Sequence, residues 1–496
     1  MRRQLLVYLV VISCFLGLAS AGSAAGAITT SYLRPNSDVQ LDRWTVVGTP
    51  TAWDALNDNV TEAQTPTLAE YIKNSSKQGH LIVNMETLPL KGQKITEATA
   101  WVHTTTSQPV ILGVSDQVGQ IAGASFSTSG WHSLPVPLSG SQAQLDNLTF
   151  RFKPDSSGEH QISAAFLKLA VDDSPRVYWG SWIDGDVYGS ESDAPWNSTT
   201  WGNFQLNTGK PVSIVHFGQP PPWIQKFDPV PFDKTIANGA IPLVDMANDF
   251  EWFPRHVTLK EITEGKVDSE LDEWSEAVAA YKKPFFFRWD WEMNGNWFPW
   301  SQEIVSGGYN QGLYRAAWIH IHNIAEANGA TNLTWVWCPN VMHSGEIGNL
   351  VHFYPGDAYV DWTCMDGYNR GTNPLNPEGW RSFSSLFSAT YNQLLSIAPS
   401  KPIMIGEVAS TEAGGSKGAW ITDALKTQLP FSFPKVKAMV WFNWNTEEEE
   451  SGAKWDWPIE SSSAATSSFA EGISWPYYAS NTFGSLPPLT KIQPLP

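Results

Sequence analysis

The sequence is poor in cysteine and in charged residues, and beyond its N-terminus it has no long apolar run. Three cysteines in 496 residues exclude a small secreted scaffold stapled by disulfides, so the protein must rely on hydrophobic cores. Charged residues make up only 16% of the chain and the net charge is −18, whereas nucleic-acid binding requires basic stripes. A membrane-spanning helix needs about 20 apolar residues, and no later segment offers them. We therefore expect no nucleic-acid partner and no membrane span.

The N-terminal segment has the three regions of a secretory signal peptide. Two arginines precede an apolar stretch over residues 5–18, and small residues follow it. We expect residues 1–25 to be a signal peptide and the protein to be secreted. The letters "VISC", which end at Cys14, resemble a lipoprotein box, so a lipid anchor at Cys14 is the alternative. The apolar run continues beyond Cys14, which disfavours the anchor.

Residues that could bind a metal are few and badly spaced. Cys338 and Cys364 lack flanking histidines, so they make a poor zinc site. A disulfide between them is conceivable, but the sequence does not show it. Asp184, Asp186 and Asp193 share one loop region without the spacing of a calcium-binding loop. We assign no metal and expect no cofactor.

Tryptophan is unusually frequent, with 26 in the chain. Many can belong to hydrophobic cores, because aromatic side chains bury large areas wherever they lie. The apolar face of a pyranose ring also stacks on indole, so a lightly charged, Trp-rich protein suggests sugar binding. Four tryptophans of the N-terminal third could form a sugar platform or could instead belong to a core: Trp44, Trp53, Trp101 and Trp131.

Residues 28–172 have β-rich, alternating segments and no clear helical period. Examples are 96–106, 109–115 and 148–154, which are separated by Gly, Ser, Pro and Asp. This pattern predicts an all-β sandwich. The module is similar to the accessory sandwiches that accompany polysaccharide-degrading enzymes, although it carries no specific fingerprint.

From about residue 173 to 496, short apolar runs alternate with amphipathic helical segments. Eight such runs occupy residues 176–182, 211–217, 241–247, 284–291, 333–339, 359–368, 401–407 and 436–444. Alternating strands and helices predict an α/β fold with a parallel sheet, and eight units fit a (β/α)8 TIM barrel. A doubly wound sheet is the alternative, but no Gly-rich phosphate loop follows any of the runs.

Two glutamates end predicted barrel strands, where catalytic groups of such barrels lie. Glu292 follows the fourth run and Glu407 ends the seventh. Alternation along a strand would place Arg288 on the face of Glu292 and Ile405 on the face of Glu407. If both faces point inward, the two carboxyl groups share a cavity. A separation of about 5 Å suits retaining glycoside hydrolysis. We expect Arg288 and Asp290 to form a paired support beneath Glu292.

The stretch "RWDWEMNGNWFPW" at 288–300, followed by an "IGE" whose glutamate lies 115 residues after Glu292, resembles glycoside hydrolase family 26. The resemblance covers about residues 176–475. It implies a (β/α)8 barrel, endo-β-1,4-mannanase activity by double displacement, Glu292 as the acid/base and Glu407 as the nucleophile. The mechanism then requires a raised pKa at Glu292 and a charged Glu407.

The resemblance also implies substrate-binding residues. Asp366 and Tyr368 lie at the end of the sixth predicted strand, and Tyr368 is expected to donate a hydrogen bond to the nucleophile. Trp297 and Trp441 match tryptophans that line sugar subsites. His216 ends the second predicted strand and is either a subsite residue or a structural histidine.

Two positions depart from the family pattern. Trp291 stands where the family usually has histidine before the acid/base, and Phe442 stands where many mannanases have arginine. These departures weaken the inference of mannan specificity more than that of the catalytic pair. The predicted substrate remains β-1,4-mannan, with mixed-linkage β-glucan and then β-1,3-xylan as alternatives. A non-catalytic carbohydrate-binding protein on the same scaffold is a third hypothesis, which the presence of both glutamates disfavours. We expect a monomer.

Overall fold

The structure is a computed structural model. It describes residues 28–496 except 57–59, 67–68, 139, 309, 342–347, 373–375, 377 and 449–452. The predicted signal peptide and the alternative lipid anchor lie outside the described residues. Within the described part of the chain, every helix is too short or too polar to cross a membrane.

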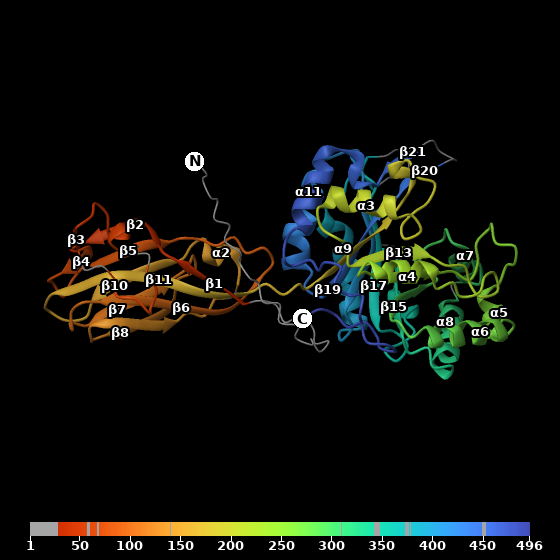
Figure 1. The fold of residues 1–496 in the computed structure, drawn as a ribbon, viewed down its shortest axis with the longest axis horizontal. Helices are drawn as coiled ribbons and strands as arrows, with labels where there is room; N and C mark the ends of the chain where they lie inside the picture. The colour runs from red at the N-terminus through yellow and green to blue at the C-terminus, as the bar shows by residue number, and fades with distance from the viewer. Residues whose placement is uncertain are drawn as a thin grey trace, which may run out of the picture.

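The N-terminal part consists of two antiparallel sheets packed face to face (Figure 1). One sheet has the order β3-β4-β11-β6-β9, with β1 paired to β11, and the other has the order β2-β5-β10-β7-β8. The strands are β1 (Ile28–Leu33), β2 (Pro35–Asp42), β3 (Thr45–Val47), β4 (Tyr71–Asn74), β5 (His80–Met85), β6 (Lys94–Thr104), β7 (Val110–Ser115), β8 (Gln120–Phe126), β9 (Gly130–Pro135), β10 (Thr149–Pro154) and β11 (His160–Asp172). Two short helices accompany them, α1 (Ala52–Leu56) and α2 (Gln142–Leu145).

Alternation of apolar and polar residues explains this sandwich. In β10, Phe150 and Phe152 point into the shared core, while Arg151 and Lys153 face solvent. Phe150 shares that core with Leu167 of the opposite sheet. One face of each sheet is therefore buried and the other is wet, as in a β-sandwich.

The C-terminal part is a closed barrel of eight parallel strands in the order of the chain. The strands are β12 (Tyr178–Ile183), β13 (Ile214–Gly218), β14 (Ile241–Met246), β15 (Phe285–Trp289), β16 (Leu333–Trp337), β17 (Trp362–Asn369), β18 (Ile403–Ser410) and β19 (Val436–Asn443). A hairpin follows, made of β20 (Asn445–Glu448) and β21 (Ala453–Asp456). The predicted fold class, a TIM barrel preceded by a β-sandwich, is confirmed.

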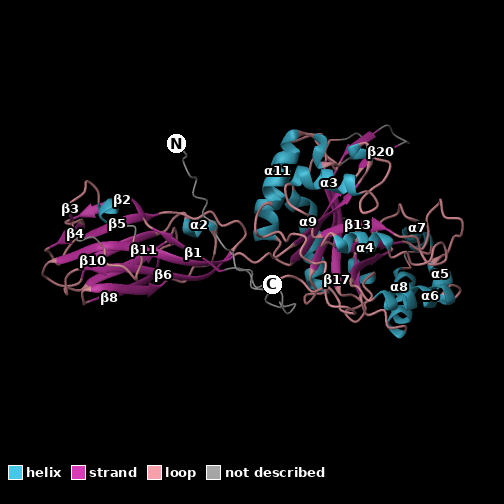
Figure 2. Ribbon diagram, in the orientation of Figure 1, coloured by secondary structure: helices cyan, strands magenta, loops and turns pink. Residues whose placement is uncertain are grey.

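Helices surround this barrel (Figure 2). They are α3 (Ser198–Thr208), α4 (Val230–Ala237), α5 (Leu259–Thr263), α6 (Asp268–Tyr281), α7 (Pro299–Ser306), α8 (Gln311–Ala327), α9 (Phe383–Ile397), α10 (Lys417–Asp423), the π-helical segment η3 (Ala424–Ser432) and α11 (Ser463–Ile473), with short 3-10 turns at η1 (Asp186–Tyr188), η2 (Leu350–His352) and η4 (Ile459–Ser461). Helix α8 shows why they pack there: Tyr314, Trp318 and Ile321 recur at helical spacing and are buried.

The barrel interior is apolar at the end where the strands begin, and the C-terminal segment covers that end. Phe286 and Trp362 pack edge to face inside it, with ring centroids 5.2 Å apart. The C-terminal segment covers the base of the barrel, where the indole N–H of Trp362 donates to the carbonyl of Ile492 at 2.9 Å. Access is therefore restricted to the opposite end, where the strands end and polar side chains begin.

Candidate active site

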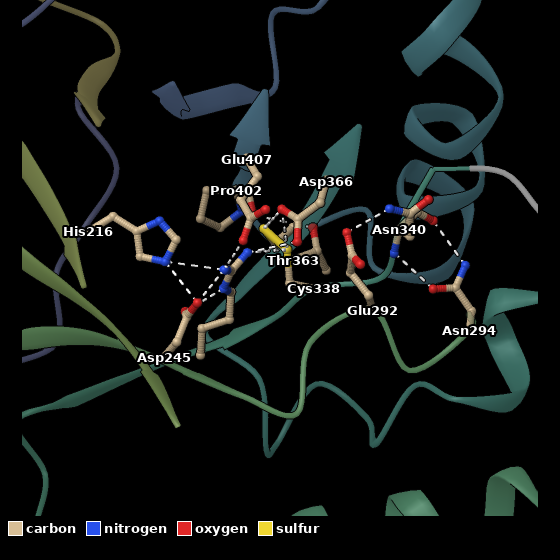
Figure 3. Close-up of a disulfide and its surroundings, with 12 residues drawn as sticks. His216, Asp245, Glu292, Asn294, Cys338, Asn340, Thr363, Asp366, Pro402 and Glu407 are labelled. Carbon is tan, nitrogen blue, oxygen red and sulfur yellow. Dashed lines mark hydrogen bonds and ion pairs between the residues drawn. A yellow bond between two sulfur atoms is a disulfide. The ribbon is translucent and has the colours of Figure 1, made fainter. Parts of the chain in front are cut away.

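Three carboxyl groups converge at the C-terminal end of the strands (Figure 3). One oxygen of each of Glu292, Asp366 and Glu407 lies within 4.8 Å of the others. The structure thus brings together the two predicted glutamates, which lie on opposite sides of Asp366 in this view. Retaining glycosidases hold their two carboxyl groups about 5 to 5.5 Å apart, and this arrangement is compatible with that spacing.

Glu292 reaches the site through a turn, so strand alternation does not place it. Strand β15 ends at Trp289, and both Asp290 and Glu292 adopt left-handed backbone angles, with φ of 40° and 52°. The N–H of Glu292 donates to the carbonyl of Cys338 at 2.7 Å, which fixes the turn against the end of β16. Non-glycine residues rarely adopt such angles, and they cluster at functional sites.

Two donors hold the carboxyl group of Glu292. Asn340 donates from Nδ2 at 2.6 Å and Trp297 from Nε1 at 2.7 Å, one to each oxygen. Asn340 is itself held by Asn294, through paired hydrogen bonds of 2.8 and 2.9 Å between side chain and backbone. Sequence reasoning missed both asparagines. The available signal was the position of Asn340, directly after a predicted strand, and of Asn294 in the quoted motif.

Burial raises the pKa of Glu292 from 4.5 to about 7, and the nearby charge of Glu407 adds to this rise. The hydrogen bonds from Asn340 and Trp297 oppose it because they favour the charged form. Glu292 therefore keeps its proton near neutral pH, as a proton donor to a leaving group must.

Glu407 has a different environment. The guanidinium of Arg288 donates to Oε1 at 2.5 Å, and the hydroxyl of Tyr368 donates to Oε2. Both oxygens of Glu407 therefore have a donor that fixes their position. Burial, and then the charge of Glu407, raise the pKa of Tyr368 well above its usual range, so its phenol remains a donor. The predicted contact between Tyr368 and Glu407 is present.

A β-bulge places Glu407 inside the barrel. Ile405 packs outward against the helices, so simple alternation is wrong for this strand. The pairing of β18 with both neighbours shifts between Ile405 and Val408, which inserts one residue and turns Glu407 inward. Gly406 is that insertion, and a Cβ there would lie 2.7 Å from Oδ1 of Asp366.

Arg288 organises the buried charges and supports Glu407, not Glu292. Its guanidinium is fully buried and binds both oxygens of Asp245, at 2.6 and 2.5 Å, and Asp366 at 2.7 Å. The predicted pairing of Arg288 with Asp290 is wrong, because Asp290 turns away and accepts from the N–H of Asn248 at 2.7 Å. The attraction between the guanidinium and the carboxylates offsets part of the free energy that is needed to remove these charges from water.

His216 belongs to this cluster and is fully buried. Its Nε2 lies 2.8 Å from Asp245, and the ring of Trp182 covers it edge-on at 4.9 Å. The structural alternative for His216 is therefore favoured over direct contact with a sugar. Asp245 was missed by sequence reasoning. Its burial would raise its pKa, yet the charges of Arg288 and His216 lower the pKa below the usual range.

Asp366 lies at the centre of the cluster. Burial, together with the neighbouring carboxylates, raises the pKa of Asp366 well above its usual range despite the bond to Arg288. Below it, Cys338 and Cys364 form a disulfide, and Sγ of Cys338 lies 3.1 Å from Oδ1 of Asp366. The disulfide that the sequence left open is thus present and forms part of the floor of the site.

Among the residues that the structure describes, three groups of side chains are close enough to bind a metal ion: Cys338, Cys364 and Asp366; His216, Asp245 and Glu407; Glu292, Asp366 and Glu407. The first group has both sulfurs in the disulfide, and the guanidinium of Arg288 already neutralises carboxylates of the other two. The loop aspartates, which the structure also describes, do not form a metal site with one another. Asp184 and Asp193 accept hydrogen bonds from the backbone N–H groups of Asp186 and Gly185, at 2.9 Å each.

The two predicted subsite tryptophans differ. Trp297 is 40% exposed beside Glu292, where a sugar could reach it. Trp441 is 1% exposed and packs outside the barrel on Phe469, with ring centroids 5.3 Å apart. Its prediction as a subsite residue is wrong, because alternate residues of β19 point to opposite sides. Its neighbour Phe442 faces the mouth and contacts Tyr368 edge-on at 5.7 Å.

The predicted sugar platform of the sandwich is not a single surface. Trp44 is buried and Trp53 packs against the core. Trp101 and Trp131 lie together on the outer face of one sheet, but their planes are inclined at 80°. The four side chains therefore do not share one flat face.

Comparison with known proteins gives concordant matches. Residues 257–413 match the model of glycosyl hydrolase family 26. Endoglucanase H of Acetivibrio thermocellus is 38% identical over 273 residues, which are 55% of this chain and 28% of that protein. A mannan endo-1,4-beta-mannosidase of Bacillus subtilis strain 168 is 24% identical over 289 residues, 57% of this chain and 69% of that protein. Another from Bacillus subtilis is 31% identical over 231 residues, 44% of this chain and 57% of that protein.

Among solved structures, a modular endo-β-1,4-mannanase from Cellulomonas fimi matches with a TM-score of 0.45 at 17% identity, over 62% of this chain and 74% of that one. The chain spans little more than a quarter of the length of Endoglucanase H, at 28%. The family match, over residues 257–413, contains both glutamates. This segment of the barrel is similar to glycoside hydrolase family 26.

Proposed function

We propose that the protein is a retaining endo-glycoside hydrolase that cleaves the backbone of β-1,4-mannan. The observation that carries this proposal is the pair Glu292 and Glu407, whose carboxyl oxygens lie within 4.8 Å of each other in opposite environments. One group keeps its proton near neutral pH, and the other is held by two donors. That division of roles is what double displacement requires.

In the first step, a carboxylate oxygen of Glu407 attacks the anomeric carbon and forms a glycosyl ester. The glycosidic bond breaks, and Glu292 gives its proton to the leaving oxygen. In the second step, Glu292 takes a proton from water, whose oxygen attacks the same carbon and releases Glu407. Two inversions leave the anomeric configuration unchanged.

The surrounding residues orient these groups. Arg288 and Tyr368 fix the two oxygens of Glu407, so its attack needs little reorientation. Asn340 and Trp297 do the same for Glu292, and the exposed part of Trp297 offers an apolar face to the sugar. Pre-ordered donors of this kind supply much of the stabilisation of a charged transition state.

A β-1,4-linked glucan, including mixed-linkage glucan, is the second candidate substrate. Two observations favour it. Endoglucanase H is 38% identical, whereas the two mannosidases above are 24% and 31% identical. Trp291 and Phe442 also give the mouth apolar rings where mannanases of the family usually have polar residues. Fewer polar groups there mean fewer hydrogen bonds that distinguish axial from equatorial hydroxyls.

The test is hydrolysis of purified β-mannan and lichenan in parallel, with mass spectrometry of the products and NMR of the first anomeric proton released. Retained configuration and products of several lengths are expected from a retaining endo-enzyme. Activity on lichenan alone would replace mannan by glucan. Inverted configuration would overturn the mechanism.

The residue assignment is tested by Glu292→Ala and Glu407→Ala, with Glu276→Ala on the exposed face of α6 as the control. Each site variant should lose activity by several orders of magnitude while polysaccharide binding persists, and the control should match wild type. Unchanged turnover in either site variant would show that the wrong carboxyl group was chosen. Absence of activity in wild type on both polymers, with binding retained, would favour the non-catalytic carbohydrate-binding protein.

Export of the protein is a separate proposal, supported by the sequence of residues 1–25. Expression of the full chain should yield protein in the culture medium whose N-terminus begins near residue 26. Recovery in a membrane fraction that Cys14→Ser abolishes would instead establish a lipid anchor.

A further inference from the structure

The most exposed tryptophan among the described residues lies away from the catalytic pair. Trp252 is 73% exposed, in the segment 247–258 between β14 and α5. Segments that follow the C-terminal ends of barrel strands lie at the same end of the barrel as Glu292. Because β14 is the third strand and β18 the seventh of a closed eight-stranded order, this segment lies across the mouth from Glu407.

The indole of Trp252 is held in a fixed position. It stacks on Phe250 with ring centroids 4.4 Å apart and planes inclined by only 10°. Phe250 in turn packs edge-on against the buried Trp300 at 5.4 Å. The N–H of Trp300 donates to the carbonyl of Trp291 at 2.8 Å, which ties this support to the residue before Glu292. Phe250 stacks on the indole and Phe253 contacts it edge-on at 6.2 Å, yet 73% of the Trp252 side chain stays exposed.

Aromatic rings connect Trp252 to the catalytic site. Trp297, which binds Glu292, contacts Phe298 with ring centroids 6.4 Å apart. Phe298 contacts Phe250 at 6.1 Å, and Phe250 stacks on Trp252. Isolated exposed apolar side chains are normal on protein surfaces, but a continuous row of rings that leaves an active site marks a binding surface.

We propose that Trp252 is a remote sugar-binding platform for the polysaccharide chain that the catalytic site cleaves. The proposal rests on the proposed function and adds a binding position beyond the sugars that contact Glu292 and Glu407. A flat, rigid and mostly exposed indole suits the apolar face of a pyranose ring. Asp249 pairs with His256 at 2.8 Å, whereas the neighbouring Glu251 is exposed and offers carboxylate oxygens to sugar hydroxyls.

A rigid platform contributes to binding without taking part in the reaction. It therefore strengthens ground state and transition state equally, and its loss raises KM for long substrates while kcat stays unchanged. A short substrate that spans only the catalytic pair does not reach Trp252, so its kinetics are independent of this residue. Stacking also loses little conformational entropy, because Phe250 already holds the indole.

The test uses the full chain with Trp252→Ala, Trp252→Tyr and, as control, Leu206→Ala, which removes an 80% exposed side chain from α3. For the polymer that wild type cleaves, KM should rise about tenfold in Trp252→Ala, a factor that corresponds to about 1.4 kcal/mol. Trp252→Tyr should retain most of the affinity, and Leu206→Ala should match wild type. An aryl glycoside of one sugar should give equal kcat/KM with every variant.

Affinity electrophoresis in gels that contain β-mannan or lichenan separates this inference from the proposed function, because it requires no turnover. Weaker retention of Trp252→Ala than of wild type supports the platform even if wild type proves inactive. If Trp252→Ala has the same KM and the same gel retention as wild type, the platform is overturned and the proposed function is left intact. An equal loss of kcat/KM on the polymer and on the aryl glycoside in Trp252→Ala would also overturn the platform, because Trp252 would then act on the catalytic site through Trp291.

Discussion

Glu292 and Glu407 have identical side chains, and their neighbours give them opposite tasks. Glu292 accepts from the neutral donors Asn340 and Trp297, and its burial together with the charge of Glu407 raises its pKa to about 7. Glu407 contacts a guanidinium and a phenol, which donate to one oxygen each. Under the proposed function, this difference assigns the acid to Glu292 and the nucleophile to Glu407.

The pKa of Glu292 predicts the alkaline limb of the pH profile. The active form carries the proton, so kcat/KM should fall as pH rises through about 7. Asn340→Ala removes a donor that lowers this pKa, so the limb should move to higher pH. Asn147→Ala, on the surface of the sandwich, serves as the control and should leave it in place. A limb that moves to lower pH in Asn340→Ala would contradict the role of this hydrogen bond.

The same pKa predicts a pH-dependent cost in stability. A folded-state pKa raised from 4.5 to about 7 means that the contribution of Glu292 is fully present below pH 4.5 and is lost as pH rises through 7. Glu292→Gln, which cannot ionise, should therefore be more stable relative to wild type at pH 8 than at pH 4.5. The difference should reach about 3 kcal/mol, from about 1.36 kcal/mol per pKa unit.

Urea unfolding of wild type and Glu292→Gln at the two pH values measures this difference, and Glu276→Gln on α6 is the surface control. If Glu292→Gln changes the free energy of unfolding equally at both pH values, ionisation of Glu292 does not destabilise the folded protein.

Among the elements, β18 decides the geometry of the site. Its bulge gives the strand one extra residue at Gly406 and so reverses the direction of Glu407. Only a residue without a side chain fits there, because a Cβ would lie 2.7 Å from Sγ of Cys364 and 2.9 Å from Nη1 of Arg288. Glu407 is thus positioned by a missing side chain in the strand that carries it.

Gly406→Ala should therefore destabilise the protein by about 1–3 kcal/mol, the usual cost of overpacking, and should lower kcat because Glu407 shifts. Gly202→Ala is the matched control, since its Cβ on α3 meets no atom within 4 Å. Alanine favours helix over glycine by up to about 1 kcal/mol, so the control should be neutral or stabilising. Wild-type stability and turnover in Gly406→Ala would show that the bulge tolerates a side chain.

At the scale of the whole molecule, the sandwich and the barrel have separate hydrophobic cores, three in all among the described residues. One is formed by sandwich residues between 33 and 171, and the barrel residues form two others, outside and inside its wall. A core that draws on one part of the chain supports independent folding of that part. The barrel also contains all of the residues that contact Glu292 and Glu407 in the site described above.

Removal of residues 28–172 should therefore leave kcat on the soluble polymer unchanged. If the sandwich anchors the enzyme, the shortened chain should release less sugar from insoluble polysaccharide, and residues 28–172 alone should sediment with it. Bovine serum albumin in the same sedimentation assay controls for trapping. Absence of the module from the pellet would reduce it to a spacer.

Local patterns determined much of this protein before folding is considered. Period-two alternation encodes the sandwich, and eight apolar runs separated by amphipathic helices encode the barrel. Glu292 and Glu407 were inferred from their places at the ends of predicted strands, since parallel strands bring those ends together. Tyr368 was implied by the family resemblance. Such features depend on residues close in sequence, which is why they can be inferred from it.

Tertiary structure alone decided the rest. The bulge at Gly406, the partners Asn340 and Asp245, the outward direction of Trp441 and the disulfide each depend on contacts between segments far apart in the chain. One inserted residue reverses every side chain after it, and no local pattern records that insertion. The direction in which a strand-end residue points is set by packing against neighbouring strands. The fold and the proximity of Glu292 and Glu407 could therefore be predicted, while the residues that support them could not.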